Sequence, residues 1–208
     1  MSNNRLDQVI FKTHYTISKD KSLVEQFINP NSEFRTKRFL ARDTSTSKSL
    51  LTELSKSISA IVRSNVGHNT NTPLESLRIL ATDEDNHVRF NVANNATTPL
   101  DILRKLSEDK TGSVRANVAL NPNTPLDILQ KLAKDLCWSV RRDIAWNPNT
   151  SSKILVVVFD RENQLEGPEA CIIRALYEHK NLPLFAKRVI ETKFEDMLFL
   201  FNPKYTRK

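Results

Sequence analysis

The chain has 208 residues, of which 39% are apolar and 26% charged, with a formal net charge of +7. This balance is typical of a folded domain and excludes a disordered tail, which has few apolar residues and a high net charge. Three glycines are too few for a phosphate-cradling loop, which needs backbone freedom, so P-loop and Rossmann nucleotide binding are excluded.

Localisation and redox state follow from what the sequence lacks. No apolar run approaches the ~18 to 20 residues that span a bilayer, and the first residues have no apolar signal core. We therefore expect a cytoplasmic protein. Cys137 and Cys171 lie outside any C-x-x-C pattern and are too few for a four-ligand metal or iron-sulfur site. They are expected to be reduced, buried packing residues.

The N-terminal part, residues 20–61, reads as one or more degenerate helical repeats. A helix is expected at 20–28, and residues 36–43 followed by Thr46 fit loosely the pattern that recurs downstream. Atypical end repeats are expected where a helical array stops.

Residues 62–160 form the regular part, in which a Thr-Pro-Leu sequence recurs at a step of 26 residues, starting at Thr72, Thr98 and Thr124. Other columns keep the same step. They are the Val-Arg pairs ending at Arg63, Arg89, Arg115 and Arg141, and the asparagines Asn69, Asn95, Asn121 and Asn147.

Each copy predicts a helical hairpin. The first helix carries a leucine stripe at helical spacing, namely Leu74, Leu77 and Leu80, then Leu100, Leu103 and Leu106, then Leu126, Leu129 and Leu132. The preceding threonine is expected to cap free backbone amides, with proline at the first helical position. The second helix is shorter, as at 86–94, and is expected to turn Val88, Val92 and Ala93 inward. One hairpin buries too little to fold alone, so neighbours must stack.

Residues 161–208 should contain an insertion and C-terminal capping helices. The insertion runs over 161–169, and Ile172, Leu176 and His179 repeat the motif faintly beyond it. The apolar stretch 194–201 is expected to cover the last open face. The whole chain, 1–208, is thus predicted to be a single helical-repeat domain.

The pattern V-R-x-x-V-A-x-N-x-x-T-P-L-x-x-L-x-x-L-x-x-D resembles that of the leucine-rich repeat variant family, which is related to HEAT and armadillo-like proteins. The resemblance covers 62–150 well. It implies an all-α fold, a right-handed superhelical solenoid of helical-hairpin repeats of 26 residues. One type of member carries an iron-sulfur centre on an N-terminal cysteine cluster, which this chain lacks, so no cofactor is expected.

The recurring arginines allow two interpretations. They could form a track for phosphates, or they could be neutralised within the scaffold by Asp83, Asp109 and Asp135, each six residues before an arginine. The second is favoured, because unpaired buried charges are costly. The asparagines are likewise interpreted as structural, since a recognition surface would vary between copies.

Columns that vary on the short helices are the candidate partner-binding surface. Trp138, Arg142 and Trp146 lie at i, i+4 and i+8, on one helix face, and aromatic and arginine side chains dominate interface hot spots. The other candidates in these columns are Phe90, Asn94, Leu120 and His68. The alternative is that the insertion or the C-terminal cap covers one or both tryptophans.

A non-enzymatic adaptor that binds a protein is the favoured function, and a nucleic-acid-binding HEAT-like protein is the alternative. Charge is nearly balanced over 62–150, and the positive excess lies at the ends, where Arg35, Lys37, Arg38 and Arg42 could contact phosphates. A DNA glycosylase-like enzyme with Asp143 as its acid is less favoured, because Asp143 occupies a column that otherwise holds asparagine. No catalytic, metal-binding or small-molecule site is recognised, since the histidines lack metal-ligand spacing, and no membrane partner is expected.

Overall fold

The computed structural model describes residues 34–199, which contain helices and no strands. It divides into two compact units, residues 1–102 and 103–208. The helix expected at 20–28 lies outside the described residues. None of the helices within 34–199 combines the length and apolar character needed to cross a membrane.

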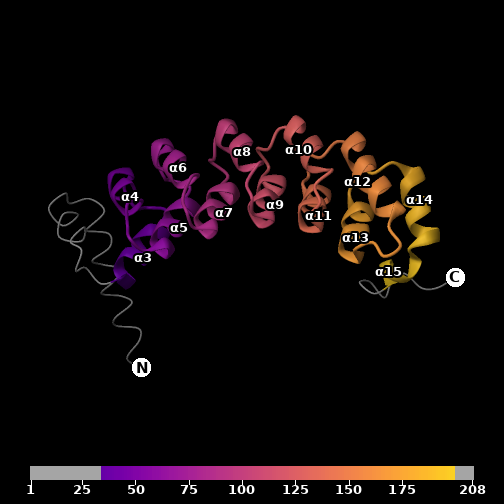
Figure 1. The fold of residues 1–208 in the computed structure, drawn as a ribbon, viewed down its shortest axis with the longest axis horizontal. Helices are drawn as coiled ribbons and strands as arrows, with labels where there is room; N and C mark the ends of the chain where they lie inside the picture. Colours follow the sequence, from indigo (N-terminus) through magenta and orange to yellow (C-terminus); the bar gives the residue numbers. More distant parts are fainter. Residues whose placement is uncertain (1–33, 200–208) are drawn as a thin grey trace, which may run out of the picture. The chain divides into compact units, whose positions relative to one another are not determined.

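The first unit contains α3 (Phe34–Arg42), α4 (Lys48–Leu54), α5 (Ala60–His68), α6 (Leu74–Leu80), α7 (Asn86–Asn94) and the start of α8 (Leu100–Leu106). Helix α5 packs between α3 and α7, and α4 and α6 form a second layer (Figure 1). Gly67 permits this close packing, since a Cβ there would lie 3.1 Å from a Val92 methyl group.

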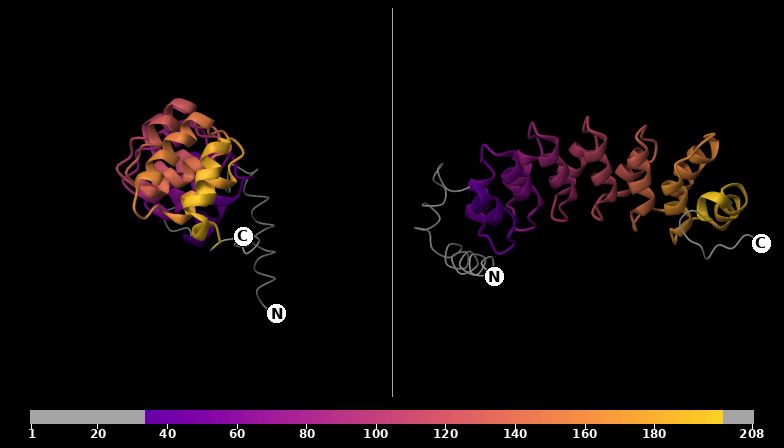
Figure 2. Two further views of the ribbon diagram at one scale, coloured as in Figure 1. Left: turned by 90° about the vertical axis from the view of Figure 1, so that its right-hand side faces the viewer. Right: turned by 90° about the horizontal axis from the view of Figure 1, so that it is seen from below.

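The second unit contains the rest of α8, α9 (Gly112–Leu120), α10 (Leu126–Leu132), α11 (Trp138–Trp146), α12 (Ser152–Gln164), α13 (Ala170–Glu178), α14 (Leu184–Lys193) and α15 (Glu195–Phe199). Helix α11 packs between α9 and α13, with α10 and α12 in the second layer (Figures 1 and 2). Helix α15 contacts α13 and α14 and buries Leu198, as expected for a cap.

The helix positions follow the sequence period. The second helix of each hairpin begins at Ala60, Asn86, Gly112 and Trp138, each 26 residues after the last, and the next begins 32 residues later, at Ala170. The first four of these helices have nine residues each, against seven in α6, α8 and α10, so the prediction that the second helix is the shorter one is wrong. The name short helix is kept for this second helix. The six additional residues are accommodated mainly by α12, which extends to Gln164.

The expected leucine stripe is wrong at its first position. Leu74, Leu100 and Leu126 are exposed, the second by 55%. The buried positions are the third, fourth and seventh of each helix, such as Ile128, Leu129 and Leu132. The first leucine opens its helix and lies about 110° around the axis from the centre of that buried face.

The predicted role of the threonines is also wrong. Their hydroxyl groups donate to a carbonyl oxygen six residues earlier, at the end of the short helix, as in Thr98 Oγ1 to Val92 O at 2.6 Å. Thr72 and Thr150 do the same. The proline that follows Thr72 or Thr124 is itself the N-cap residue and makes no side-chain hydrogen bond. The threonine thus satisfies an acceptor left open where the short helix ends.

The asparagines tie each turn to the one before it. Asn95 Nδ2 donates to Gly67 O and Asn69 O, both at 2.9 Å, while its Oδ1 accepts from the Thr97 amide at 2.8 Å. Asn147 repeats this arrangement with Ala119 O, Asn121 O and the Asn149 amide. These side chains are buried, and their structural interpretation is confirmed.

The arginines are satisfied in the same way. Arg115 donates to Asp135 through Nε and Nη2, at 2.7 and 2.9 Å, and to Asp109 O through Nη1 at 2.7 Å. Arg63 binds Asp83 in the same bidentate manner. The carboxylate that pairs with each of these arginines therefore follows it by 20 residues, and the expected network between inter-helix turns is confirmed.

We predict that Asn147→Ala lowers the free energy of unfolding by about 2 to 4 kcal/mol, because it leaves two buried carbonyl oxygens and an amide without partners. Urea unfolding measures the loss. The control is Asn149→Ala, an exposed position with one side-chain bond to Pro122 O, which should cost less than about 1 kcal/mol. Equal losses for the two variants would contradict a structural role for the buried amide.

Candidate functional site

The open face of α11 carries the strongest candidate residues. Trp138 and Trp146 are 42% and 43% exposed, so the alternative in which the insertion or the cap covers them is wrong. Arg142 lies between them along the helix, with its guanidinium carbon 5.3 Å from the centre of the Trp138 ring. This stacking fixes the arginine on the indole face.

The other predicted residues divide between the two units. On the first unit, His68 and Asn94 are exposed at the ends of α5 and α7, and Phe90 is half-buried one turn before Asn94. On the second unit, Leu120 is exposed at the end of α9, one repeat before Trp146. Ala116, which precedes Arg142 by one repeat, is buried and offers no surface.

The predicted phosphate-contacting residues, Arg35, Lys37, Arg38 and Arg42, all belong to α3. Arg38 and Arg42 are exposed and Lys37 is half-buried. Helix α3 holds no acidic residue, so it is a basic stretch of the first unit.

Asp143 is buried beneath the arginine of the α11 face. Its Oδ1 accepts from Arg142 Nε at 2.7 Å. Burial raises the pKa of the Asp143 carboxyl group, and the opposing hydrogen bond from Arg142 does not offset it. The Arg142 pKa is raised chiefly by the same bond. The pair therefore favours both charges, but burial of the carboxylate outweighs that gain.

The cysteines do not fully match their prediction. Both are free thiols, as expected, but both are half-buried rather than buried. The Cys137 pKa is lowered, chiefly by its hydrogen bond with Ser139, while burial raises the Cys171 pKa. Within residues 34–199 no cluster of three or more His, Cys, Asp or Glu side chains is arranged to hold a metal ion.

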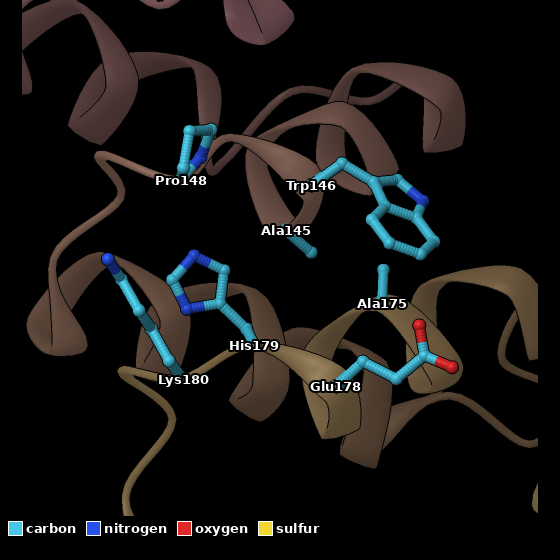
Figure 3. A pocket seen from close by; sticks show the side chains of 7 residues that line it. All are labelled: Ala145, Trp146, Pro148, Ala175, Glu178, His179 and Lys180. Atoms are coloured by element: carbon cyan, nitrogen blue, oxygen red, sulfur yellow. The ribbon is translucent and has the colours of Figure 1, made fainter.

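A pocket of about 270 Å³ opens beside Trp146, where α11 and α13 end (Figure 3). Ala145, Trp146 and Pro148 line it from the end of α11 and the turn after it, and Ala175 and His179 line it from α13 and the turn after that helix. Sequence reasoning identified Trp146 but not the pocket, because its other wall comes from the degenerate last repeat.

His179 lines the pocket without offering a free polar atom. Its Nε2 donates to Asn147 O at 3.0 Å, and its Nδ1 accepts from the Asn181 amide at 3.0 Å. Because a carbonyl oxygen only accepts and an amide only donates, this geometry requires a neutral ring with its proton on Nε2. His179 thus replaces the asparagine of the regular repeats.

Two charged side chains form the remaining wall. Glu178 lies on the Trp146 side and Lys180 on the Pro148 side (Figure 3). The Glu178 carboxylate accepts from Arg174 Nε at 2.9 Å, one turn earlier in α13. The pocket therefore combines an apolar interior with a charged rim, and its lining residues come from the ends of α11 and α13 and the turns that follow them.

Glu162 is the structural residue that sequence reasoning missed. It is completely buried, and its Oε1 accepts from Arg141 Nε at 2.6 Å. Strict 26-residue spacing after Asp135 would place the acid at position 161, which is an arginine. The extended helix α12 supplies the carboxylate one residue later, so spacing alone could not identify it.

Comparison of the sequence with protein-family models and with curated proteins finds no match. The case for function therefore depends on the residues themselves.

We predict that Trp146→Ala changes the free energy of unfolding by less than about 1 kcal/mol, because 43% of the residue's surface is exposed and it lies outside the buried core. Ile144→Ala, two residues earlier in the same helix and fully buried, should cost about 2 to 5 kcal/mol. Urea unfolding distinguishes them. A loss from Trp146→Ala as large as that from Ile144→Ala would assign the indole to the core.

We predict that Asp143→Asn stabilises the protein modestly at neutral pH. Burial raises the pKa of the Asp143 carboxyl group in the folded protein. The folded protein therefore loses stability as pH rises through that pKa and the buried group becomes charged, whereas below the unfolded pKa the group is neutral in both states and this loss is absent. The gain from asparagine should therefore shrink as pH falls below about 4. Thermal unfolding at several pH values measures this, and a destabilised Asp143→Asn protein at neutral pH would show that the ion pair dominates.

Proposed function

We propose that this protein is a non-enzymatic helical-repeat scaffold that binds a protein partner through the open faces of its short helices. In this proposal the hairpins form a right-handed superhelical solenoid related to the leucine-rich repeat variant and HEAT or armadillo-like families. The 26-residue step of the helices supports it, as does packing of each short helix against the next within each unit.

One observation carries the proposal: the recurring polar residues are satisfied internally, while the bulky side chains of α11 remain exposed. Asn147 and Arg141 bind carbonyl oxygens and a buried carboxylate. Trp138 and Trp146, on the same helix, are over 40% exposed. Exposing two indoles gains nothing for folding, and tryptophan and arginine are enriched in protein interfaces.

The ready-made geometry favours tight binding. Arg142 is held by both the Trp138 ring and Asp143, and the helix beneath is anchored on α9 and α13. Side chains that are already ordered lose less conformational entropy when a partner binds.

The arrangement of arginines favours protein over nucleic acid. Arg63 and Arg115 are engaged by carboxylates, so they provide no phosphate track. The specific support for the alternative is α3, where Arg38 and Arg42 are exposed on a helix without acids. Asp143 is assigned a structural role, because a general acid must reach its substrate and this carboxylate is buried against Arg142.

Photo-crosslinking tests the proposal. A benzoylphenylalanine at position 146 should form an adduct with a discrete protein in native extract, and the same probe at exposed Gln130 on α10 should not. With that partner purified, Trp146→Ala should weaken binding by more than about 1 kcal/mol, or roughly fivefold.

Labelled DNA and RNA provide the opposing measurement. Fluorescence anisotropy between ~50 and ~200 mM salt should show only weak binding that disappears as salt rises. Submicromolar binding that survives and that falls with Arg38→Ala or Trp146→Ala would replace the proposal with the nucleic-acid alternative. No adduct at position 146 and no nucleic-acid binding would contradict both.

A further inference from the structure

The pocket beside Trp146 is small. Its volume of about 270 Å³ falls below the ~300 to 1,000 Å³ typical of small-molecule and cofactor sites. A leucine, methionine or phenylalanine side chain can enter a space of this size together with part of its neighbouring backbone.

The interior favours an apolar occupant. Ala145, Ala175, Trp146 and Pro148 contribute apolar surface to its lining. The polar atoms of His179 are both engaged, with Asn147 O and the Asn181 amide. A polar occupant would lose its hydration there without gaining hydrogen bonds.

The charged residues at the rim of the pocket favour an acidic residue next to the inserted side chain. Glu178 is already paired with Arg174. Lys180, by contrast, makes no hydrogen bond or ion pair with any residue in the described part of the chain, and its ammonium stands at the Pro148 edge (Figure 3). A basic group from a partner would meet Lys180 and Arg174, whereas a carboxylate would gain the unpaired lysine.

We infer that this pocket binds an extended acidic segment of a partner protein, with one leucine, methionine or phenylalanine side chain inserted beside Trp146. An adjacent aspartate or glutamate of that segment pairs with Lys180. This inference rests on the proposed function. It adds to it the sequence pattern that a partner segment needs in order to bind.

Selection of a random dodecapeptide display library on the purified full-length protein tests it. The expected consensus is an apolar residue next to aspartate or glutamate. For a fluorescein-labelled selected peptide, Trp146→Ala should reduce affinity at least about tenfold, and Lys180→Glu about fivefold to tenfold. Lys153→Glu on α12 is the matched control, since this exposed lysine lies outside the pocket, and should change affinity less than about twofold.

Charge exchange separates recognition from a change in the fold. A peptide whose acidic residue is replaced by lysine should bind wild type weakly and the Lys180→Glu protein better. A consensus without an acidic residue, or equal binding to wild type and Lys180→Glu, would overturn the inference. Peptides insensitive to Trp146→Ala would overturn it too.

The two proposals fail differently. A protein adduct from position 146 with no enriched peptide would leave the protein-binding function intact and overturn the linear-segment inference. The absence of both adduct and enriched peptide would overturn both.

Discussion

The structure depends on a buried carboxamide that bridges successive turns. Asn69, Asn95 and Asn147 each donate to two carbonyl oxygens of the preceding turn and accept from an amide two residues ahead. A primary amide carries two donors and an acceptor in one plane, so no other side chain of this size makes all three bonds. This requirement fixes where each short helix ends and how it meets its neighbour within a unit.

The arginine pairs extend the same constraint to the other end of the short helix. Arg115 binds the turn before its own helix through Asp109 O and the next turn through the Asp135 carboxylate. Burial alone would raise the Asp135 pKa, but the hydrogen bonds from Arg115 and the Cys137 amide outweigh it and hold the pKa below its usual value. With both ends engaged internally, the outward positions of the short helix can vary without cost to the scaffold. Those positions hold Leu120, Arg142 and Trp146.

The sequence predicted helix positions well because two independent constraints, apolar spacing and the recurring turn motif, have the same period. The sequence-based prediction failed where one side chain could hydrogen-bond to either of two neighbouring helix ends. The Thr98 hydroxyl could accept from the following helix or donate to the preceding one, and only the structure shows that it donates to Val92 O. Spacing also failed beyond Thr150, where the repeat is six residues longer. There the carboxylate that pairs with Arg141 is Glu162, and His179 stands where the regular repeats have asparagine.

The candidate site was predictable in part. Helical spacing placed Trp138, Arg142 and Trp146 on one face, but exposure depends on what later segments cover. The exposure of these side chains depends on how α13 to α15 pack, and the last repeats match the sequence pattern too weakly to predict that packing. The pocket beside Trp146 belongs to the same category, because Glu178, His179 and Lys180 become neighbours of α11 only through the inserted residues.

Hydrogen exchange of asparagine side-chain amides, followed by NMR, tests the central claim most directly. The claim is that the recurring polar residues are hydrogen-bonded within the fold, and that the variable residues remain exposed and available to a partner. It predicts slow exchange of the Nδ2 protons of Asn95 and Asn147, which are buried and hydrogen-bonded, and fast exchange for exposed Asn94. Equally fast exchange for all three would show that the repeated asparagines are available to solvent, and would contradict the division between scaffold and surface.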